Sequence, residues 1–183
     1  MIMNENKRSN FGFTMVEVMV VVAIIGIMAA IAVPSFISWL PDYRLRSDTR
    51  DIVSCLQGMK MRAAAENSNV VIIFDLTAES YQSFVDDGGD DSSGIANDYL
   101  HNGSEVILKN LTLHPDVEFV SSTFYSTPSP YSSTLVYYGF NSRGMPVSNK
   151  STNLINGGTI VLQNSNLKSL QVVGNIAGNI RVP

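Results

Sequence analysis

The sequence predicts an α+β fold in which a long N-terminal helical spine packs on a C-terminal, mostly antiparallel β-sheet or β-sandwich head. Three observations predict this fold class. Residues 18–41 form a run without a charge, the apolar residues that follow recur at helical spacing, and from residue 70 onward β-rich runs alternate with turns. With 183 residues, the chain is long enough for one folded domain and one membrane segment.

Composition and motifs argue against an enzyme or a nucleic-acid-binding protein. With 12 Lys and Arg against 16 Asp and Glu, the net charge of −4 provides no basic field for nucleic acid. The sequence has no phosphate-binding G-x-x-x-x-G-K-[ST] loop and no H-E-x-x-H zinc motif, and His101 and His114 lie in polar, loop-like surroundings. Cys55 is the only cysteine, so it forms no disulfide within the chain and is expected to be a packed residue. We therefore expect no enzymatic activity, no catalytic residues, no metal site and no cofactor.

The apolar run predicts a membrane span, because about 20 apolar residues cross a hydrocarbon layer. Lys7 and Arg8 precede the run, and the positive-inside rule places the N-terminus in the cytoplasm and the rest of the chain on the other side. A cleaved secretory signal peptide is the alternative, with the small residues of 30–32 as its cleavage site. Glu17 inside the apolar core and Pro34 just after that site count against this alternative.

Glu17 needs a physical explanation, since an unpaired carboxylate in hydrocarbon costs on the order of 2.5–3.5 kcal/mol. The dipole of the first helical turn favours an anion by roughly 0.3–1 kcal/mol, which offsets only part of that cost. A carboxylate in this position therefore requires a partner of opposite charge. The alternative is a simple membrane anchor that tolerates the carboxylate.

The residues around Glu17 resemble a known processing signal. A short basic leader, Gly12, the aromatic Phe13 and a glutamate five positions after the glycine are followed without a break by the apolar helix. This pattern resembles the class III signal of type IV prepilins and type II secretion pseudopilins. The resemblance implies that a prepilin peptidase removes the leader, residues 1–12, by cutting between Gly12 and Phe13, and that it N-methylates Phe13. It also implies a single-pass protein of the bacterial inner membrane with its head in the periplasm.

Cleavage would provide the partner that Glu17 needs. The α-amino group freed on Phe13 has a reference pKa of about 7.7–8.0, so it is mostly cationic at neutral pH, and methylation leaves the charge in place. The resemblance implies that Glu17 of an entering subunit pairs with the Phe13 amine of a subunit already in a filament. That pairing would neutralise two charges together in a layer of low dielectric constant and fix the axial register.

Two helical stretches are predicted after the leader. Residues 13–40 are the transmembrane and assembly helix, and Pro34 is expected to kink it because proline removes a helical hydrogen bond. Pro41 is expected to begin a new helical segment, and residues 41–67 form the amphipathic second half of the spine. Its predicted buried stripe consists of Leu45, Thr49, Ile52, Leu56, Met59 and Ala63. The charged residues on its other sides are predicted to be solvated: Arg44, Arg46, Asp48, Arg50, Asp51, Lys60 and Arg62.

Residues 68–183 are the predicted periplasmic, β-rich head. Turns rich in Gly, Pro, Asn and Ser separate its β-rich runs, and the first two runs are expected to form a hairpin. The predicted strands are residues 70–76, 80–85, 105–113, 117–122, 135–141, 158–164, 169–174 and 178–182.

The C-terminal half carries a second resemblance. The stretches "YYGFNSRGMPV" (137–147), "GGTIVLQN" (157–164) and "LQVVGNIAGNIRV" (170–182) resemble the GspH/FimT family of minor pseudopilins and pilins, which pairs an F-x-x-x-G turn with a late pair of strands. DNA-uptake members of the family often place a basic turn in the last hairpin. Here only Arg181 is charged, which weakens a role in binding nucleic acid.

The two resemblances imply a minor pseudopilin, a structural subunit that contributes to tip assembly of the type II secretion pseudopilus and to protein export across the outer membrane. The implied partners are the prepilin peptidase, other major and minor pseudopilins or pilins, the inner-membrane assembly platform with its ATPase, and secreted cargo. The alternative is a minor type IV pilin for pilus assembly, adhesion or DNA uptake.

Two loops are candidate partner surfaces. The acidic stretch 85–98 contains hard oxygen ligands that suit Ca²⁺, but it lacks EF-hand spacing, and acidic inserts rich in Gly and Ser are usually surface loops. The second loop, residues 123–133, contains aromatic residues that either anchor a partner or pack on the sheet. The candidate residues are Asp86, Asp87, Asp90, Asp91, Tyr125 and Tyr131.

Overall fold

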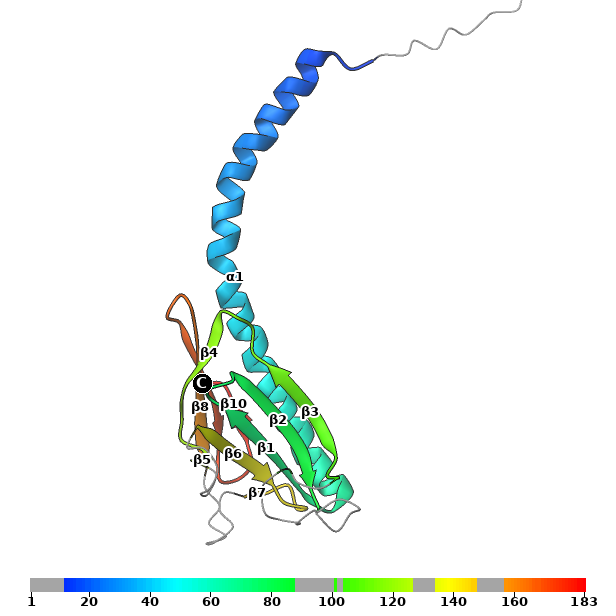
Figure 1. The fold of residues 1–183 in the computed structure, drawn as a ribbon, viewed down its shortest axis with the longest axis vertical. Helices are drawn as coiled ribbons and strands as arrows, with labels where there is room; N and C mark the ends of the chain where they lie inside the picture. Colours follow the sequence, from blue (N-terminus) through cyan, green and yellow to red (C-terminus); the bar gives the residue numbers. More distant parts are fainter. Residues whose placement is uncertain (1–11, 88–100, 102–103, 127–133, 148–156) are drawn as a thin grey trace, which may run out of the picture. The chain divides into compact units, whose positions relative to one another are not determined.

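The computed structural model describes residues 12–87, 101, 104–126, 134–147 and 157–183 (Figure 1). The chain divides into two compact units, Met1–Leu40 and Pro41–Pro183. Helix α1, Met15–Glu66, contributes residues to both units, and the strands of the described residues all belong to the second unit.

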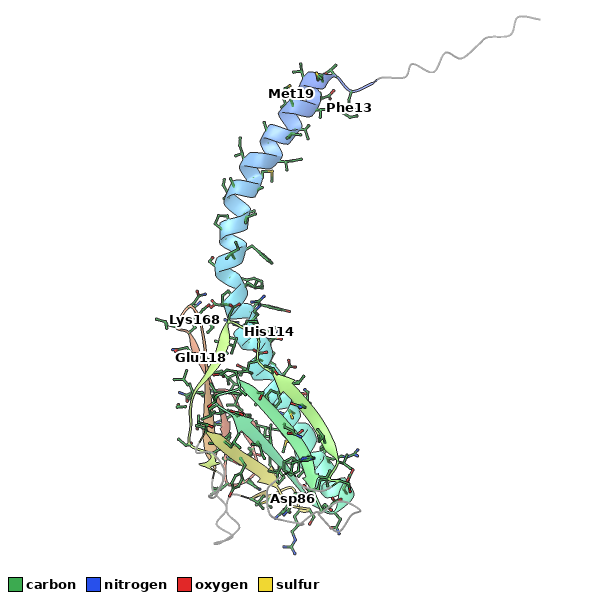
Figure 2. All side chains as sticks on the ribbon, in the orientation of Figure 1. Phe13, Met19, Asp86, His114, Glu118 and Lys168 are labelled. Atoms are coloured by element: carbon green, nitrogen blue, oxygen red, sulfur yellow. The ribbon has the colours of Figure 1, made fainter. Side chains whose placement is uncertain are left out.

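The first unit is an apolar helix whose side chains are exposed. All residues from 13 to 39 are exposed, and Figure 2 shows the side chains of Phe13 and Met19 on the surface of the helix. Among the described residues, α1 is the one helix that is long and apolar enough to cross a membrane. Residues 15–40 would extend about 39 Å at 1.5 Å per residue, more than the roughly 30 Å of a hydrocarbon layer. The structure thus confirms the predicted N-terminal apolar helix.

Helix α1 continues through both of its prolines. The expected new helical segment at Pro41 is wrong, because α1 passes through Pro34 and Pro41 as one element. Proline removes one backbone donor, but its fixed φ of about −65° matches the helix, so the hydrogen bonds on either side can continue. The kink at Pro34 stays a prediction.

The second half of α1 buries the predicted stripe. Residues three or four positions apart share one face of a helix, and this face packs into the core of the head. The buried residues of α1 are Leu45, Asp48, Thr49, Ile52, Cys55, Leu56, Met59 and Ala63. All six stripe residues are therefore confirmed, and the stripe is widened by Asp48 and Cys55.

The larger sheet has the strand order β3-β2-β1-β6-β5, and β7 pairs with β6. All its neighbouring strands are antiparallel, and β1 and β2 form the predicted hairpin. Its strands are β1 (Asn69–Asp75), β2 (Ser80–Asp86), β3 (Ile107–Thr112), β5 (Tyr125–Ser126), β6 (Leu135–Phe140) and β7 (Pro146–Val147).

The smaller sheet has the order β10-β9-β8-β4, again with antiparallel neighbours. Its strands are β4 (Val117–Ser122), β8 (Gly158–Asn164), β9 (Ser169–Gly174) and β10 (Ile180–Arg181). Each predicted β-rich run overlaps one of the observed strands, so the α+β class is confirmed. Strands β5 and β7 were not predicted, because each is two residues long and adjoins a turn-rich stretch.

Aromatic rings join the two sheets in one core. The ring of Phe74 on β1 meets the ring of Phe119 on β4 edge-on, with centroids 5.7 Å apart. Phe124 stacks on Tyr138 of β6 at 4.7 Å, and Leu56 of α1 belongs to the same buried cluster. Such ring pairs add about 0.5–1.5 kcal/mol each beyond their buried area. The helix stripe and both sheets therefore share one core.

The F-x-x-x-G turn fixes the loop after β6 against α1. Phe140 is fully buried, and Asn141 Oδ1 accepts the Met145 backbone N–H at 3.1 Å. Gly144 has φ of +69°, a left-handed conformation that favours glycine, and a Cβ there would lie 3.3 Å from Lys60 Cγ. A larger residue would strain the backbone and press on Lys60.

Candidate functional site

The predicted processing signal lies just before the first turn of α1. The helix begins at Met15, and Thr14 Oγ1 accepts the Glu17 backbone N–H at 3.2 Å. Thr14 therefore caps the helix, and Gly12 and Phe13 precede the helix. The peptide bond between Gly12 and Phe13 lies outside the helix and the strands.

The structure leaves both sides of this bond accessible. Phe13 is 81% exposed, and no atom of the described residues lies within 4 Å of a Cβ built at Gly12. A larger residue at position 12 would thus meet no obstacle among the described residues. A requirement for glycine at position 12 would come from the peptidase that binds the signal.

Glu17 lies in the first turn of α1, exposed, and it is the only charged residue between Phe13 and Pro41. A carboxylate in this turn is favoured by the helix dipole. Sequence reasoning missed the cap, although Thr14 and Glu17 form the T-x-x-E pattern that signals a helix start. In this chain the Phe13 nitrogen belongs to a peptide bond, so the charge pairing stays a prediction about the cleaved form.

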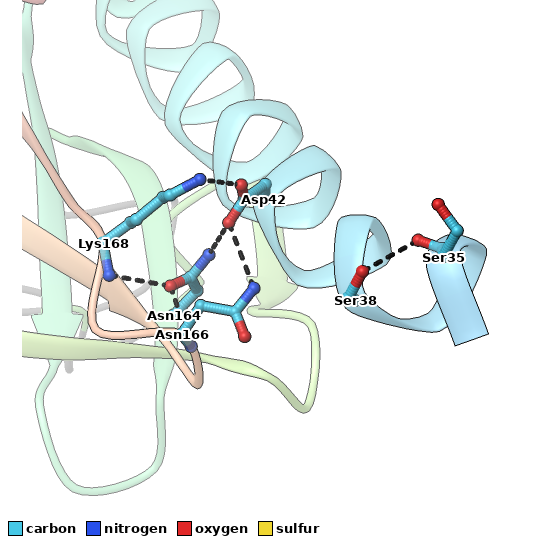
Figure 3. Close-up of polar contacts among 6 residues, drawn as sticks. All are labelled: Ser35, Ser38, Asp42, Asn164, Asn166 and Lys168. Atoms are coloured by element: carbon cyan, nitrogen blue, oxygen red, sulfur yellow. Dashed lines mark hydrogen bonds and ion pairs between the residues drawn. The ribbon is translucent and has the colours of Figure 1, made fainter.

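The head holds the start of its helical segment through a polar cluster around Asp42 (Figure 3). Asp42 Oδ1 accepts hydrogen bonds from Asn164 Nδ2 at 2.7 Å and from Asn166 Nδ2 at 3.3 Å. Lys168 Nζ forms an ion pair with the same carboxylate. The Lys168 contact, followed by that of Asn164, lowers the pKa of Asp42. Because the folded-state pKa is lowered, the charged contact is present at neutral pH and is lost as the pH falls through that pKa.

A second cluster corrects the prediction for Asp48. This residue was expected on the solvated face, but it is 5% exposed. Its Oδ2 accepts the His114 backbone N–H at 3.0 Å, and its Oδ1 lies 2.6 Å from His114 Nδ1. Arg44, also predicted to be solvated, is partly buried and pairs with Asp116. The turn between β3 and β4 thus fixes Asp48 and Arg44 through contacts that helical spacing does not reveal.

Lys60 also departs from the prediction of a solvated face. It is half-buried, and its Nζ donates to the Gly178 carbonyl at 3.1 Å. The remaining charged residues of this set are exposed, as predicted: Arg46, Arg50, Asp51 and Arg62.

The candidate partner loops are only partly described. Asp86 is the last residue of β2 and is buried, whereas Asp87 is exposed. Tyr125 lies in β5. Asp90, Asp91 and Tyr131 lie outside the described residues. In the part of the chain that the structure describes, no group of three potential metal ligands comes together. Calcium binding by the acidic stretch stays a prediction.

Cys55 lies on the buried face of α1. Its Sγ contacts the Ser83 hydroxyl at 3.7 Å, and burial raises the pKa of the thiol. A thiol with a raised pKa stays protonated at neutral pH and is a poor nucleophile. The geometry therefore supports the predicted packing role.

A comparison with protein families matches the N-terminal segment. Residues 7–33 match the family described as the prokaryotic N-terminal methylation motif. The type IV major fimbrial protein FimA of Dichelobacter nodosus is 49% identical over 58 residues, which are 32% of this chain and 34% of that protein. The match thus spans about a third of the length of the curated relatives. This chain therefore carries a type IV prepilin-like methylation motif.

Solved structures match the fold of the chain. The minor pseudopilin EpsH from the type 2 secretion system of Vibrio cholerae has a TM-score of 0.51 at 11% identity, covering 76% of this chain and 96% of that chain. The type IV minor pilin FimU of Pseudomonas aeruginosa also has a TM-score of 0.51 at 11% identity, covering 78% of this chain and 90% of that chain. At this identity the likeness shows the fold alone. The chain thus carries a type IV prepilin-like methylation motif, and its fold resembles that of solved minor pseudopilins and pilins.

Replacing Asp48 tests the polar contacts of the helix. Asp48→Ala should lower the free energy of unfolding by about 1–3 kcal/mol, because the His114 N–H loses its acceptor. Urea unfolding of the full chain in detergent measures this change. Asp51→Ala is the matched control, since Asp51 is exposed on the same helix and should change stability by less than about 0.5 kcal/mol. Equal effects of the two variants would contradict the burial of Asp48.

Proposed function

We propose that this protein is a minor pseudopilin, a non-enzymatic structural subunit of a type II secretion pseudopilus. One combination of features carries the proposal: a methylation motif before an exposed apolar helix, joined in one chain to a head with the fold of EpsH. A structural subunit needs an assembly helix and a folded head. The exposed apolar helix and the folded head of the described residues support this proposal.

The assembly steps follow from the charges of the N-terminal segment. Lys7 and Arg8 hold the leader in the cytoplasm while residues 15–40 anchor the precursor in the inner membrane. The prepilin peptidase cuts before Phe13 and methylates the new amine. The cationic amine then meets Glu17 of a neighbouring subunit, which removes two unfavourable charges from the lipid at once.

The head would supply the contacts with other subunits and with cargo in the periplasm. A partner ATPase on the inner-membrane platform would supply energy, since the sequence contains no P-loop motif. We place the subunit near the filament tip, as a minor subunit with a β-rich head.

A minor type IV pilin is the second candidate function. The likeness to the fold of FimU and the sequence match to FimA support a minor pilin. This support is as strong as the support that the likeness to EpsH gives a pseudopilin. DNA uptake is less supported, because the chain has a net charge of −4 and Arg181 is the only charged residue of the last hairpin.

Gly12 tests the proposed processing. In Gly12→Val the peptidase should no longer accept the signal, so intact mass of the membrane-extracted chain should show that residues 1–12 are retained. The parent should begin at Phe13 and carry one methyl group. Gly26→Val, within the apolar helix, is the control and should be cut normally, since nothing lies within 4 Å of a Cβ there. Normal maturation of Gly12→Val would disprove the peptidase assignment.

Glu17 tests the proposed charge pairing. Glu17→Ala leaves the Phe13 amine without a counter-ion in the lipid, so incorporation into filaments should fall on the order of tenfold or more. The measurement is the amount of cleaved chain in sheared filaments, relative to the amount in membranes. Insertion and cleavage should be unchanged. Glu17→Asp keeps the charge and should retain more incorporation than Glu17→Ala. Full incorporation of Glu17→Ala would rule out the pairing.

Deletion of the protein in its native host separates the two candidate functions. A minor pseudopilin predicts that exported proteins accumulate in the periplasm while surface pili remain. A minor pilin predicts that surface pili are lost while exported proteins still reach the culture medium. The measurements are the protein content of the culture medium and the number of pili seen by electron microscopy, with re-expression of the parent chain as the control.

A further inference from the structure

The turn between β8 and β9 carries an exposed leucine in an unfavourable backbone conformation. Leu167 has φ of +62° and is 78% exposed. Left-handed backbone is normally left to glycine or asparagine, and an exposed leucine keeps its apolar surface in water. The Leu167 N–H donates to the Asn164 carbonyl at 2.9 Å, which helps to fix the turn. Both the left-handed backbone and the exposed apolar surface of Leu167 are unfavourable, which points to a function for its side chain.

This turn is bound to the start of the helical segment of the head. Residues 165–168, here called the hairpin tip, contain two of the residues that contact Asp42, and Asn164 before the tip supplies the third contact (Figure 3). Asp42 is the first charged residue after the uncharged run, residues 18–41. The hairpin tip is therefore bound to the helix close to residue 41, where the uncharged run ends.

The side chains around the hairpin tip suit a lipid surface. Arg46 and Lys168 line one hollow of about 210 Å³, together with Asp42, Leu45, Ser169 and Leu170. Arg46 is exposed, Lys168 keeps 65% of its side chain exposed, and Tyr43 is 55% exposed. Cations near a membrane attract phosphate groups, and tyrosine is enriched at the headgroup level. An apolar side chain such as Leu167 enters the boundary between headgroups and acyl chains.

We propose that the hairpin tip, with Tyr43 and Arg46, binds the phospholipid headgroups of the membrane that residues 15–40 span. The inference rests on the proposed membrane anchoring, and it adds a second membrane contact made by the head. Arg46 complements the headgroup phosphates, Lys168 stays paired with Asp42, and Leu167 inserts between the headgroups. Lipid contact explains why leucine occupies a turn position that suits glycine.

Leu167 is not the only exposed apolar residue in a turn of the described residues. Ile176 is 62% exposed and also lies in a turn, between β9 and β10. That turn contacts Lys60 through the Gly178 carbonyl, and Lys60 lies about 27 Å further along the helix than Asp42 at 1.5 Å per residue. Ile176 thus provides a matched control that is far from the end of the apolar run.

The test is lipid quenching of a single tryptophan in the full chain. Trp39, the only tryptophan, is first changed by Trp39→Phe. Leu167→Trp and Ile176→Trp are then reconstituted separately, at one chain per nanodisc, in phosphatidylethanolamine and phosphatidylglycerol with brominated acyl chains. Bromine quenches a tryptophan that reaches the acyl boundary, so Leu167→Trp should be quenched on the order of threefold more than Ile176→Trp. Circular dichroism checks that both variants are folded.

Charge reversal provides a second measurement. Arg46→Glu in the Leu167→Trp chain should reduce the quenching, whereas Arg50→Glu, one helical turn further from the apolar run, should reduce it less. Equal quenching of Leu167→Trp and Ile176→Trp would overturn the proposal. The proposal would also fail if Leu167→Trp were quenched only when several chains share one disc, since the lipid contact would then depend on a second copy. Failure of the parent chain to insert into discs would instead refute the membrane anchoring itself.

Discussion

A single charge in an exposed apolar helix is the constraint on which the rest of this protein depends. Glu17 is the only charged residue between Phe13 and Pro41, and a lipid environment demands a positive partner for it. At the start of the head, Asp42 is paired with Lys168 and Arg44 with Asp116. Removal of a leader from the same chain would create the missing positive charge at Phe13. In our proposal, processing and assembly are therefore two steps of one electrostatic arrangement.

Helix α1 meets two different environments along its length. From residue 41 onward one stripe packs against both sheets, and the aromatic contact of Phe74 with Phe119 joins those sheets into one core. Residues 13–39 are exposed all round, so their apolar surface must be covered by lipid or by other helices. In our proposal, lipid covers this apolar surface while the precursor is in the membrane, and helices of other subunits cover it in the filament. The polar contacts of Asp42 and Asp48 fix the head where this helix enters it.

Much of the fold could be predicted from the sequence because it depends on local periodicity. Apolar residues recur at helical spacing in the stripe that contains Leu56, and β-rich runs mark the longer strands. Strands β5 and β7 are too short to show any period. The burial of Asp48 could not be predicted, because His114 lies 66 residues away and only the folded chain brings the two together. The helix cap at Thr14 was visible as a T-x-x-E pattern. In our proposal the partner of Glu17 belongs to another subunit. Neither the sequence nor the structure of a single chain contains that contact.

The most direct test of the central claim is a zero-length cross-link. A membrane-permeant carbodiimide joins a carboxylate to an amine only when the two are in contact. Filaments assembled from a mixture of ¹⁴N- and ¹⁵N-labelled chains would be treated, digested and analysed by mass spectrometry. Our account predicts a peptide in which Glu17 of one chain is joined to the methylated amine of Phe13 from a chain of the other label. Assembled filaments whose Phe13 amine is never linked to Glu17, or is linked only within one chain, would contradict it.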